Sequence, residues 1–507
     1  MIRVAAFALV LVVAAPAVAQ DDREIEAAIN ELRTKVEELR GLPVKPVRWS
    51  VADRAAFAES LTQVKYRERE RAWVEDVERR KEVAWSFLGL LPPGARLAEI
   101  ERRQAGDVLG YYVTVGERSL HLCRDITAAG RRKLREEIEK RWAEAERLAD
   151  VRRAMNDWQG AAYLSTLESQ HGFRFERATL FHELLHAAQD QKWNLHGYDE
   201  ADSTDMELAF SALIEGDARA AEAEFSVGPE KASGLLAVYR AGYEQLLQKD
   251  DGDDAVPRFM RVTSEFQYSD GAAFVAAVRK ERGGAWTAVD DCYAAPPLAT
   301  RNVLHPESYL RRGDDVAAVR LPVLDKAGEP VWNDSLGEMG VRFVLRATMS
   351  GGRLRAVLKP AEADRSSAGW RGDRYQLLRT NGGGLALAWV SVWSDTRAAA
   401  DFAGAYAKVL GWKRPDAQVV SDSGDRYRIR EEGRASFVVR TGLRVLVGEN
   451  VPEAGADALE QSLRDAEVLP LVRGAAGPGY ACEAHPAWTG KRAGHCRFCG
   501  RKMSEVK

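Results

Sequence analysis

The pentapeptide His182-Glu183-Leu184-Leu185-His186 constrains the fold and the chemistry of this chain more than any other stretch. Residues four apart share one face of a helix, so both imidazoles can reach a single ion. A Zn²⁺ ion held by three protein ligands keeps one position open for water and lowers the pKa of that water to about 7. Glu183 stands beside the imidazoles and can accept a proton. The sequence therefore predicts His182 and His186 as zinc ligands and Glu183 as the catalytic base.

A third zinc ligand must come from a different segment. The apolar spacing predicts helices over residues 174–191, which contain the pentapeptide, and over residues 205–225. The second helix carries Glu215, followed by Gly216, a residue small enough to let the two helices approach closely. Glu207 on the same predicted helix is the competing candidate, and either acid could instead be a solvated side chain. We favour Glu215 as the third ligand.

Hydrolysis of a peptide also needs a group that stabilises the developing oxyanion, which is commonly a His or Tyr near the metal. His305, Tyr268 and Tyr309 are the candidates, although each has a plausible structural role and the sequence alone does not bring any of them to the metal. Asp217 is a candidate for orienting a ligand imidazole by accepting a hydrogen bond from the ring nitrogen that does not bind the metal.

The net charge and the N-terminus restrict the classes of partner. With 73 Lys and Arg against 76 Asp and Glu, the chain has a formal charge of -3 and no electrostatic footprint for nucleic acid. Residues 1–19 combine a charged start, an apolar run and a small-residue end, which is the order of a secretory signal peptide. A membrane anchor is the alternative, but the run is shorter than the roughly 20 residues that span a bilayer. We expect cleavage after Ala19, no membrane span afterwards, and a periplasmic or extracellular location.

The five cysteines form two groups. Cys123 and Cys292 are isolated in the body of the chain, where an oxidising compartment would allow one disulfide between them. Two buried thiols are an equally good interpretation. The other three, Cys482, Cys496 and Cys499, lie close together at the C-terminus.

The sequence predicts an α+β protein with several parts. We expect a signal peptide over 1–19, a mainly helical domain over 20–325, an α+β domain over 326–472, a linker over 473–479 and a metal-binding tail over 480–507. The first domain begins with a helical stripe over 21–40 and includes a long helical segment over 57–91 and a hairpin over 108–122. The second domain alternates helix-like and strand-like segments: 336–349, 375–378, 385–393, 396–410, 427–430, 436–440, 443–448 and 456–463.

These motifs together resemble a group of exported bacterial HExxH proteins of the gluzincin type, in which the Glu of an EGxA segment completes a two-His, one-Glu zinc site. The resemblance rests on residues 182–191 and on Glu215-Gly216-Asp217-Ala218. It extends to further segments along most of the mature chain: 41–44, 110–112, 268–275, 304–310 and 369–375. The resemblance implies a zincin-like fold and a metallopeptidase, although the family is mostly uncharacterised. The charged segment 131–157 is a departure from the family.

The C-terminal tail contains a second set of metal-ligating residues. Cys482 and His485 form a CxxH pair, and Cys496 and Cys499 form a CxxC pair ten residues later. Two such pairs on short turns can close a tetrahedral site of three thiolates and one imidazole. The tail resembles the heavy-metal-binding domain found beside copper-exporting P-type ATPases and efflux-pump adaptors.

The tail departs from that family at its methionines. Glu483-Ala484 replace the usual Pro-Met, and Arg501 replaces a Met. Since thioethers favour Cu⁺, their loss leaves the site suited to Zn²⁺ as well as Cu⁺. A structural zinc ribbon is the alternative.

The leading hypothesis is an exported zinc metallopeptidase that acts on a peptide or protein and carries a metal-binding tail. The alternative is a non-catalytic periplasmic protein that handles Zn or Cu or serves as a scaffold.

Overall fold

The fold is that of a computed structural model, which describes residues 18–66, 71–105, 108–114, 116–124, 175–195, 203–248, 256–311, 316–350, 353–471, 480–482, 485–490 and 504–505. The predicted signal peptide therefore lies almost entirely outside the described residues, as do the charged segment 131–157 and the predicted linker. The described chain mixes helices and strands, as predicted. Among the described residues, no helix combines the length and the apolar character needed to cross a membrane.

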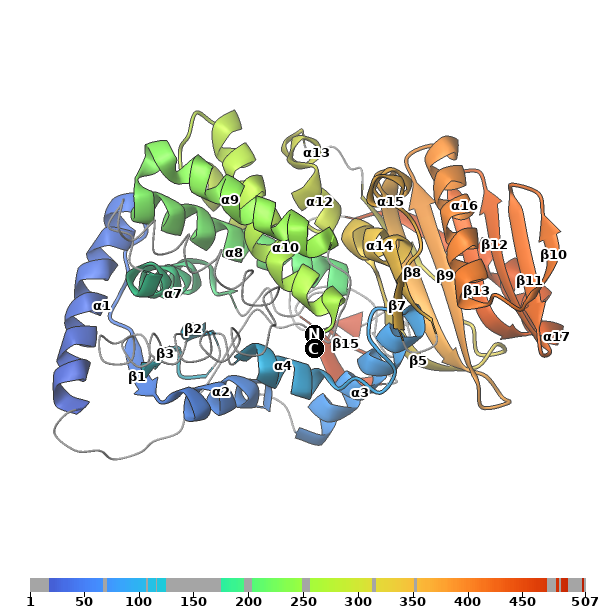
Figure 1. The fold of residues 1–507 in the computed structure, drawn as a ribbon, viewed down its shortest axis with the longest axis horizontal. Coiled ribbons are helices and arrows are strands. Elements are labelled where there is room, and N and C mark those ends of the chain that lie inside the picture. The colour runs from blue at the N-terminus through green and yellow to red at the C-terminus, as the bar shows by residue number, and fades with distance from the viewer. Residues whose placement is uncertain are drawn as a thin grey trace, which may run out of the picture.

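The N-terminal half is a helical assembly built around α7 (Phe175–Trp193), the helix that carries the pentapeptide. Figure 1 shows α7 between α8 (Thr204–Val227) and a small sheet. The sheet has the order β1-β3-β2, with β2 and β3 antiparallel as the predicted hairpin requires and β1 parallel to β3. Its strands are β1 (Arg48–Ala52), β2 (Gly110–Val113) and β3 (Ser119–Cys123).

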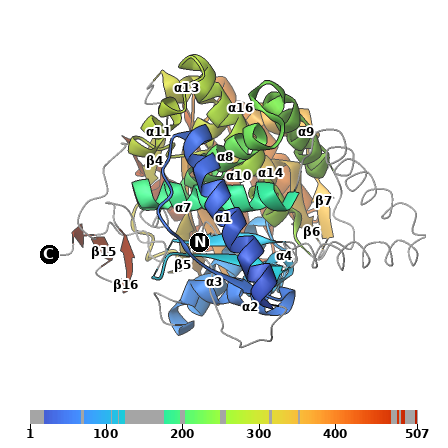
Figure 2. The same ribbon diagram turned by 90° about the vertical axis from the view of Figure 1, so that its left-hand side faces the viewer.

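Helix α1 (Val18–Arg40) packs across α7, as Figure 2 shows. Four residues of its predicted stripe, Ile25, Ile29, Leu32 and Val36, are buried in one core with α7 and with β2 and β3. The remaining helices of this half are α2 (Arg54–Gln63), α3 (Arg71–Leu88), α4 (Leu97–Ala105), α9 (Pro229–Gln248), α10 (Arg258–Glu281), α11 (Thr287–Ala294), α12 (Thr300–Leu304) and α13 (Pro306–Leu310).

Two glycines let α8 and α10 cross at very short distance. A Cβ added to Gly216 would lie 2.2 Å from the carbonyl carbon of Gly271, and one added to Gly271 would lie 2.2 Å from the carbonyl oxygen of Ala212. Only residues without a side chain permit this approach. The sequence predicts that Gly216 lets α8 approach the helix of the pentapeptide closely, whereas the structure places the close approach at Gly216 between α8 and α10.

The C-terminal half contains a seven-stranded antiparallel sheet of order β10-β11-β12-β13-β9-β8-β5. Because successive strand residues face opposite sides, Trp389 packs with α16 while Val390 packs with α17. The strands are β5 (Glu329–Asp334), β8 (Trp370–Arg379), β9 (Leu385–Trp393), β10 (Gln418–Asp422), β11 (Arg426–Glu431), β12 (Arg434–Thr441) and β13 (Arg444–Pro452). The helices are α14 (Gly337–Arg346), α15 (Pro360–Ser367), α16 (Thr396–Lys413) and α17 (Glu453–Arg464).

The two halves share one continuous hydrophobic core. A single cluster of buried residues joins Phe259 and Phe274 of α10 to Trp332 of β5 and Trp389 of β9. Two short strand pairs complete the described body, namely β4 (Ala317–Arg320) with β14 (Glu467–Pro470) and β6 (Ala347–Ser350) with β7 (Arg353–Ala356).

Cys123 and Cys292 are both buried thiols, and no disulfide joins them. They lie in different hydrophobic clusters, so each packs as a small apolar side chain. The structure therefore favours the thiol interpretation over the disulfide.

Candidate metal centre

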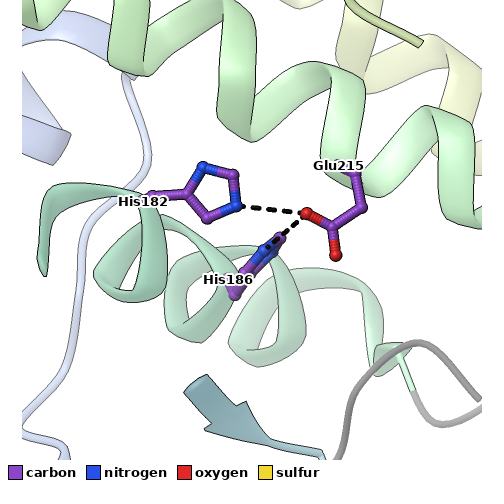
Figure 3. A group of neighbouring side chains, drawn as sticks. All are labelled: His182, His186 and Glu215. Carbon is purple, nitrogen blue, oxygen red and sulfur yellow. Dashed lines mark hydrogen bonds and ion pairs between the residues drawn. The ribbon is translucent and has the colours of Figure 1, made fainter. Parts of the chain in front are cut away.

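Three side chains from two helices converge on one point between α7 and α8, as Figure 3 shows. The Nε2 atom of His182 lies 3.1 Å from Oε2 of Glu215, and Nε2 of His186 lies 3.3 Å from the same oxygen. Two ligand atoms bound about 2.0–2.1 Å from a tetrahedral zinc are about 3.3 Å apart, so this spacing suits one ion. Within the described ranges, no other three His, Cys, Asp or Glu side chains meet as closely.

The three side chains His182, His186 and Glu215, here called the triad, are buried, and each shifts the pKa of its neighbours. Burial lowers the pKa of His182, but hydrogen bonds to Glu215 and Glu222 outweigh burial and raise it to about 10. In the same way, the Glu215 carboxylate raises the pKa of His186 despite burial. The two imidazoles in turn hold the pKa of Glu215 well below its ordinary value although burial opposes this shift. The triad therefore attracts positive charge, and a metal ion would compete with protons for it.

Each imidazole of the triad is oriented through its second nitrogen. The Nδ1–H of His182 donates to Oε2 of Glu222, at 2.9 Å, and the Nδ1–H of His186 donates to Oε1 of Gln189, at 2.8 Å. Both bonds direct Nε2 towards Glu215. Partners of this kind fix the tautomer of a metal-binding histidine and make it a stronger ligand. Neither Glu222 nor Gln189 is predicted as a site residue from the sequence.

Glu183, the predicted catalytic base, lies beside the triad. Burial raises the pKa of Glu183, while the neighbouring His186 and His182 oppose that shift. A Cβ added to Gly110 of β2 would lie only 3.2 Å from Cγ of Glu183, so the glycine leaves just enough room for the carboxylate.

A cavity of about 270 Å³ adjoins the triad, and its wall includes Glu183, His186, Glu215 and Tyr268. The wall continues over apolar side chains of several helices and of the loops beside them: Leu61, Val74, Val77, Ala105, Val108, Leu195 and Met260. Lys65, which is paired with Glu78 at 2.6 Å and with Glu101 at 2.8 Å, also lines it. The cavity can therefore hold a molecule with apolar groups beside the triad.

Of the three residues predicted as candidates to stabilise an oxyanion, one lies at the cavity and two lie elsewhere. Tyr268 lines the cavity, and its ring centroid is 6.0 Å from that of His182. His305 instead bonds Glu338 through Nε2 at 2.9 Å, and the Tyr309 hydroxyl donates to a backbone carbonyl. Neither lines the cavity.

Two acids of α8 also lie apart from the triad. Glu207 is buried two turns before Glu215 and is not among the side chains that converge there. Asp217 contacts neither imidazole and reaches His186 only through Gln189, whose amide nitrogen donates to its carboxylate at 3.0 Å.

Comparison with known protein families gives a match in the C-terminal half of the chain. Residues 323–460 match a family described as a domain of unknown function (DUF8575). This segment contains all seven strands of the large sheet and excludes the triad. No curated protein and no solved structure matches the chain.

The predicted tail site lies largely outside the described residues. Cys496 and Cys499 belong to the undescribed part. The backbone of β15 (Tyr480–Cys482) pairs with β16 (His485–Gly490), and Cys482 and His485 are register partners in that pair. The described backbone therefore brings these two positions opposite each other.

Proposed function

We propose that this protein is an exported zinc-dependent metallopeptidase. The observation that carries the proposal is the convergence of His182, His186 and Glu215 at metal-ligand spacing, with Glu183 and a cavity beside them. Two imidazoles and one carboxylate form a donor set typical of catalytic zinc.

In this proposal the three convergent side chains would hold Zn²⁺. When bound, the ion would supply Lewis acidity, polarising a carbonyl group and lowering the pKa of a water molecule. Glu183 accepts a proton from the attacking water and passes it to the leaving amine. The burial that raises the pKa of Glu183 suits this role, because a base works best with a pKa close to the working pH.

We assign stabilisation of the developing oxyanion to Tyr268. Burial raises its pKa well above the ordinary value, and the Glu215 and Glu183 carboxylates add to this shift. The hydroxyl therefore keeps its proton at neutral pH and can donate a hydrogen bond. The apolar wall of the adjoining cavity suits an uncharged side chain of a peptide substrate.

The C-terminal tail would form a separate metal site. We propose that Cys482, His485, Cys496 and Cys499 bind Zn²⁺ or Cu⁺, which would stabilise a segment too small to fold well alone. This site would be distinct from the triad in both ligands and chemistry.

The proposal is tested with purified residues 20–507 and a peptide library read by mass spectrometry. We expect the wild type to cleave peptides, and Glu183→Gln to lose cleavage by at least about 100-fold while it retains the triad zinc. Glu224→Gln is the matched control, because Glu224 lies on α8 but pairs with Arg279. Metal content is measured with Cys496 and Cys499 replaced by Ser, so that tail metal does not contribute.

Full activity of Glu183→Gln would refute the mechanism. A wild type that binds zinc at the triad but cleaves nothing would instead support the non-catalytic metal-binding alternative.

A further inference from the structure

Helix α1 ends in a charged residue that is buried completely. The side chain of Arg40 has no exposed surface, and its Nε donates to Oδ1 of Asp217 at 2.8 Å. Its Nη2 donates to Oδ2 of Asp217 at 3.2 Å and lies 2.7 Å from Asp290. The guanidinium also lies over the ring of Trp286, at 4.8 Å. A buried charge is costly unless it is paired, so this arrangement ties α1 firmly to α8.

The contacts of Asp217 continue towards the triad. Its Oδ2 accepts from the Tyr293 hydroxyl at 2.9 Å and from Nε2 of Gln189 at 3.0 Å. The same Gln189 nitrogen donates to the carbonyl of Ile214 at 3.2 Å. Because the amide nitrogen faces two acceptors, the amide oxygen must be the atom that faces His186.

The orientation of this amide decides which nitrogen of the neutral His186 ring, the form that binds a metal ion, carries the proton. An amide oxygen accepts, so Nδ1 must donate, and the lone pair of Nε2 is left for a metal ion. A reversed amide would present its NH₂ group to Nδ1. The proton would then reside on Nε2, where it blocks ligation.

We propose that Arg40 is a positioning residue of the metal centre and acts on His186 through Asp217 and Gln189. Loss of the guanidinium leaves the buried Asp217 carboxylate without the partner that fixes its position, and Asp217 is one of the two acceptors that hold the Gln189 amide. Docking of α1, the first helix of the mature chain in our proposal, thus completes a site whose ligands lie on α7 and α8. This inference rests on the proposed function only in taking His186 as a zinc ligand.

The test uses residues 20–507 with Cys496 and Cys499 replaced by Ser. Zinc affinity is measured by competition with a chelator, and Arg40→Met is expected to weaken it by about tenfold, the lower end of the loss expected when the group that orients a metal-binding histidine is disturbed. A second readout needs no metal: in zinc-free, ¹⁵N-histidine-labelled protein, the Nδ1–H of His186 should exchange slowly with water. Arg40→Met should abolish that protection, and a His186→Gln variant assigns the signal.

Arg301→Met is the matched control. Arg301 is also buried, and its Nη1 donates to Glu338 at 2.9 Å and to the carbonyl of Ala368 at 2.8 Å, neither of which belongs to the triad or bonds to it. We expect this variant to lower the melting temperature and to leave both zinc affinity and the His186 signal unchanged.

Tyr293→Phe covers the case in which Arg40→Met does not fold. It removes one donor to Asp217 but keeps the ring that stacks on Trp193 at 3.8 Å. We expect a smaller loss of zinc affinity and faster exchange of the His186 signal, and Arg40→Lys should fall between wild type and Arg40→Met.

Unchanged affinity and exchange in the folded variants would overturn the proposal. A wild type that hydrolyses no peptide would refute the proposed function, whereas the exchange of the His186 proton would still decide the role of Arg40.

Discussion

Tyr268 is the residue whose role can be separated most cleanly from metal binding. Its ring, on α10, lies near His182, and the guanidinium of Arg219 on α8 lies 5.1 Å from the centroid of that ring. If the protonated hydroxyl stabilises an oxyanion, Tyr268→Phe should lower kcat by about 100-fold, which is the usual loss for one such donor. The KM for a peptide and the zinc content should change little. Steady-state kinetics with metal analysis on the same preparation checks this.

Tyr309→Phe is the control for loss of a tyrosine hydroxyl. Tyr309 donates to the carbonyl of Ala295 at 2.6 Å and does not line the cavity. It should keep its kcat and lose about 1 kcal/mol of stability. Equal kcat values for Tyr268→Phe and wild type would remove Tyr268 from the mechanism.

The sequence allows some residues of the site to be predicted better than others. His182, Glu183 and His186 lie within five residues, so helix geometry alone brings them together. Glu222 is missed, although it follows Glu215 by two helical turns and shares its face. Its partnership with His182, like that of Gln189 with His186, depends on how α7 packs against α8, and a single sequence does not determine that packing.

At the scale of elements, the crossing of α8 and α10 holds in place the helix that carries Glu215. Gly216→Ala would place a Cβ 2.2 Å from the backbone of Gly271, so the helices must separate. We expect a loss of about 1–3 kcal/mol in the free energy of unfolding. Weaker zinc binding should accompany it, because the adjacent Glu215 moves with α8. Thermal unfolding and metal titration measure the two effects.

Gly404→Ala provides the comparison within a helix. Gly404 is exposed in α16, and nothing lies within 4 Å of an added Cβ. This change should stabilise the protein by about 0.5–1 kcal/mol, because alanine favours the helix and restricts the unfolded chain. A similar gain in Gly216→Ala would show that the helices do not meet as described.

Elements with strong periodicity are predicted well, and their interruptions are not. The expected helix over 57–91 is divided, because α2 ends at Gln63, a 3-10 turn covers Val64–Tyr66, and α3 starts at Arg71. In that turn Lys65 pairs with acids of both α3 and α4. Likewise, the segment 336–349 stops being helical at Arg346, since the following residues pair with β7. Ion pairs to two other helices accompany the first break, and a local hairpin makes the second.

At the scale of the whole molecule, buried carboxylates join the two halves. Asp334 of β5 accepts hydrogen bonds from the backbone and the hydroxyl of Thr204, at the start of α8. Asp373 of β8 accepts from the backbone of Gly337, at the start of α14. Both acids meet the positive ends of helices, which stabilises their charge. The bonds to Asp334 tie α8, which carries Glu215, to the seven-stranded sheet, and the bond to Asp373 ties α14 to the same sheet.

Asp205 belongs to this junction and gives it a testable pH dependence. Its Oδ1 accepts from the backbone and hydroxyl of Thr300, yet burial dominates and raises its pKa from 3.8 to about 7, with Asp373 and Asp334 adding to the shift. Between these values the folded protein holds a proton that the unfolded chain has released. The stabilisation that comes from this tighter proton binding by Asp205 is therefore fully present below pH 3.8 and is lost as the pH rises to about 7.

Asp205→Asn removes this titration, so the free energy of unfolding should fall less between about pH 4 and 7 than in the wild type, by up to a few kcal/mol. Urea unfolding at several pH values measures the difference. Asp395→Asn is the control of opposite sign, because hydrogen bonds from the first turn of α16 lower the pKa of that exposed acid. Its stabilisation is lost as the pH falls, so its removal should flatten the acid side of the curve. Parallel curves for Asp205→Asn and wild type would mean that Asp205 stays charged when buried, and that the junction holds its carboxylates by hydrogen bonds and helix ends alone.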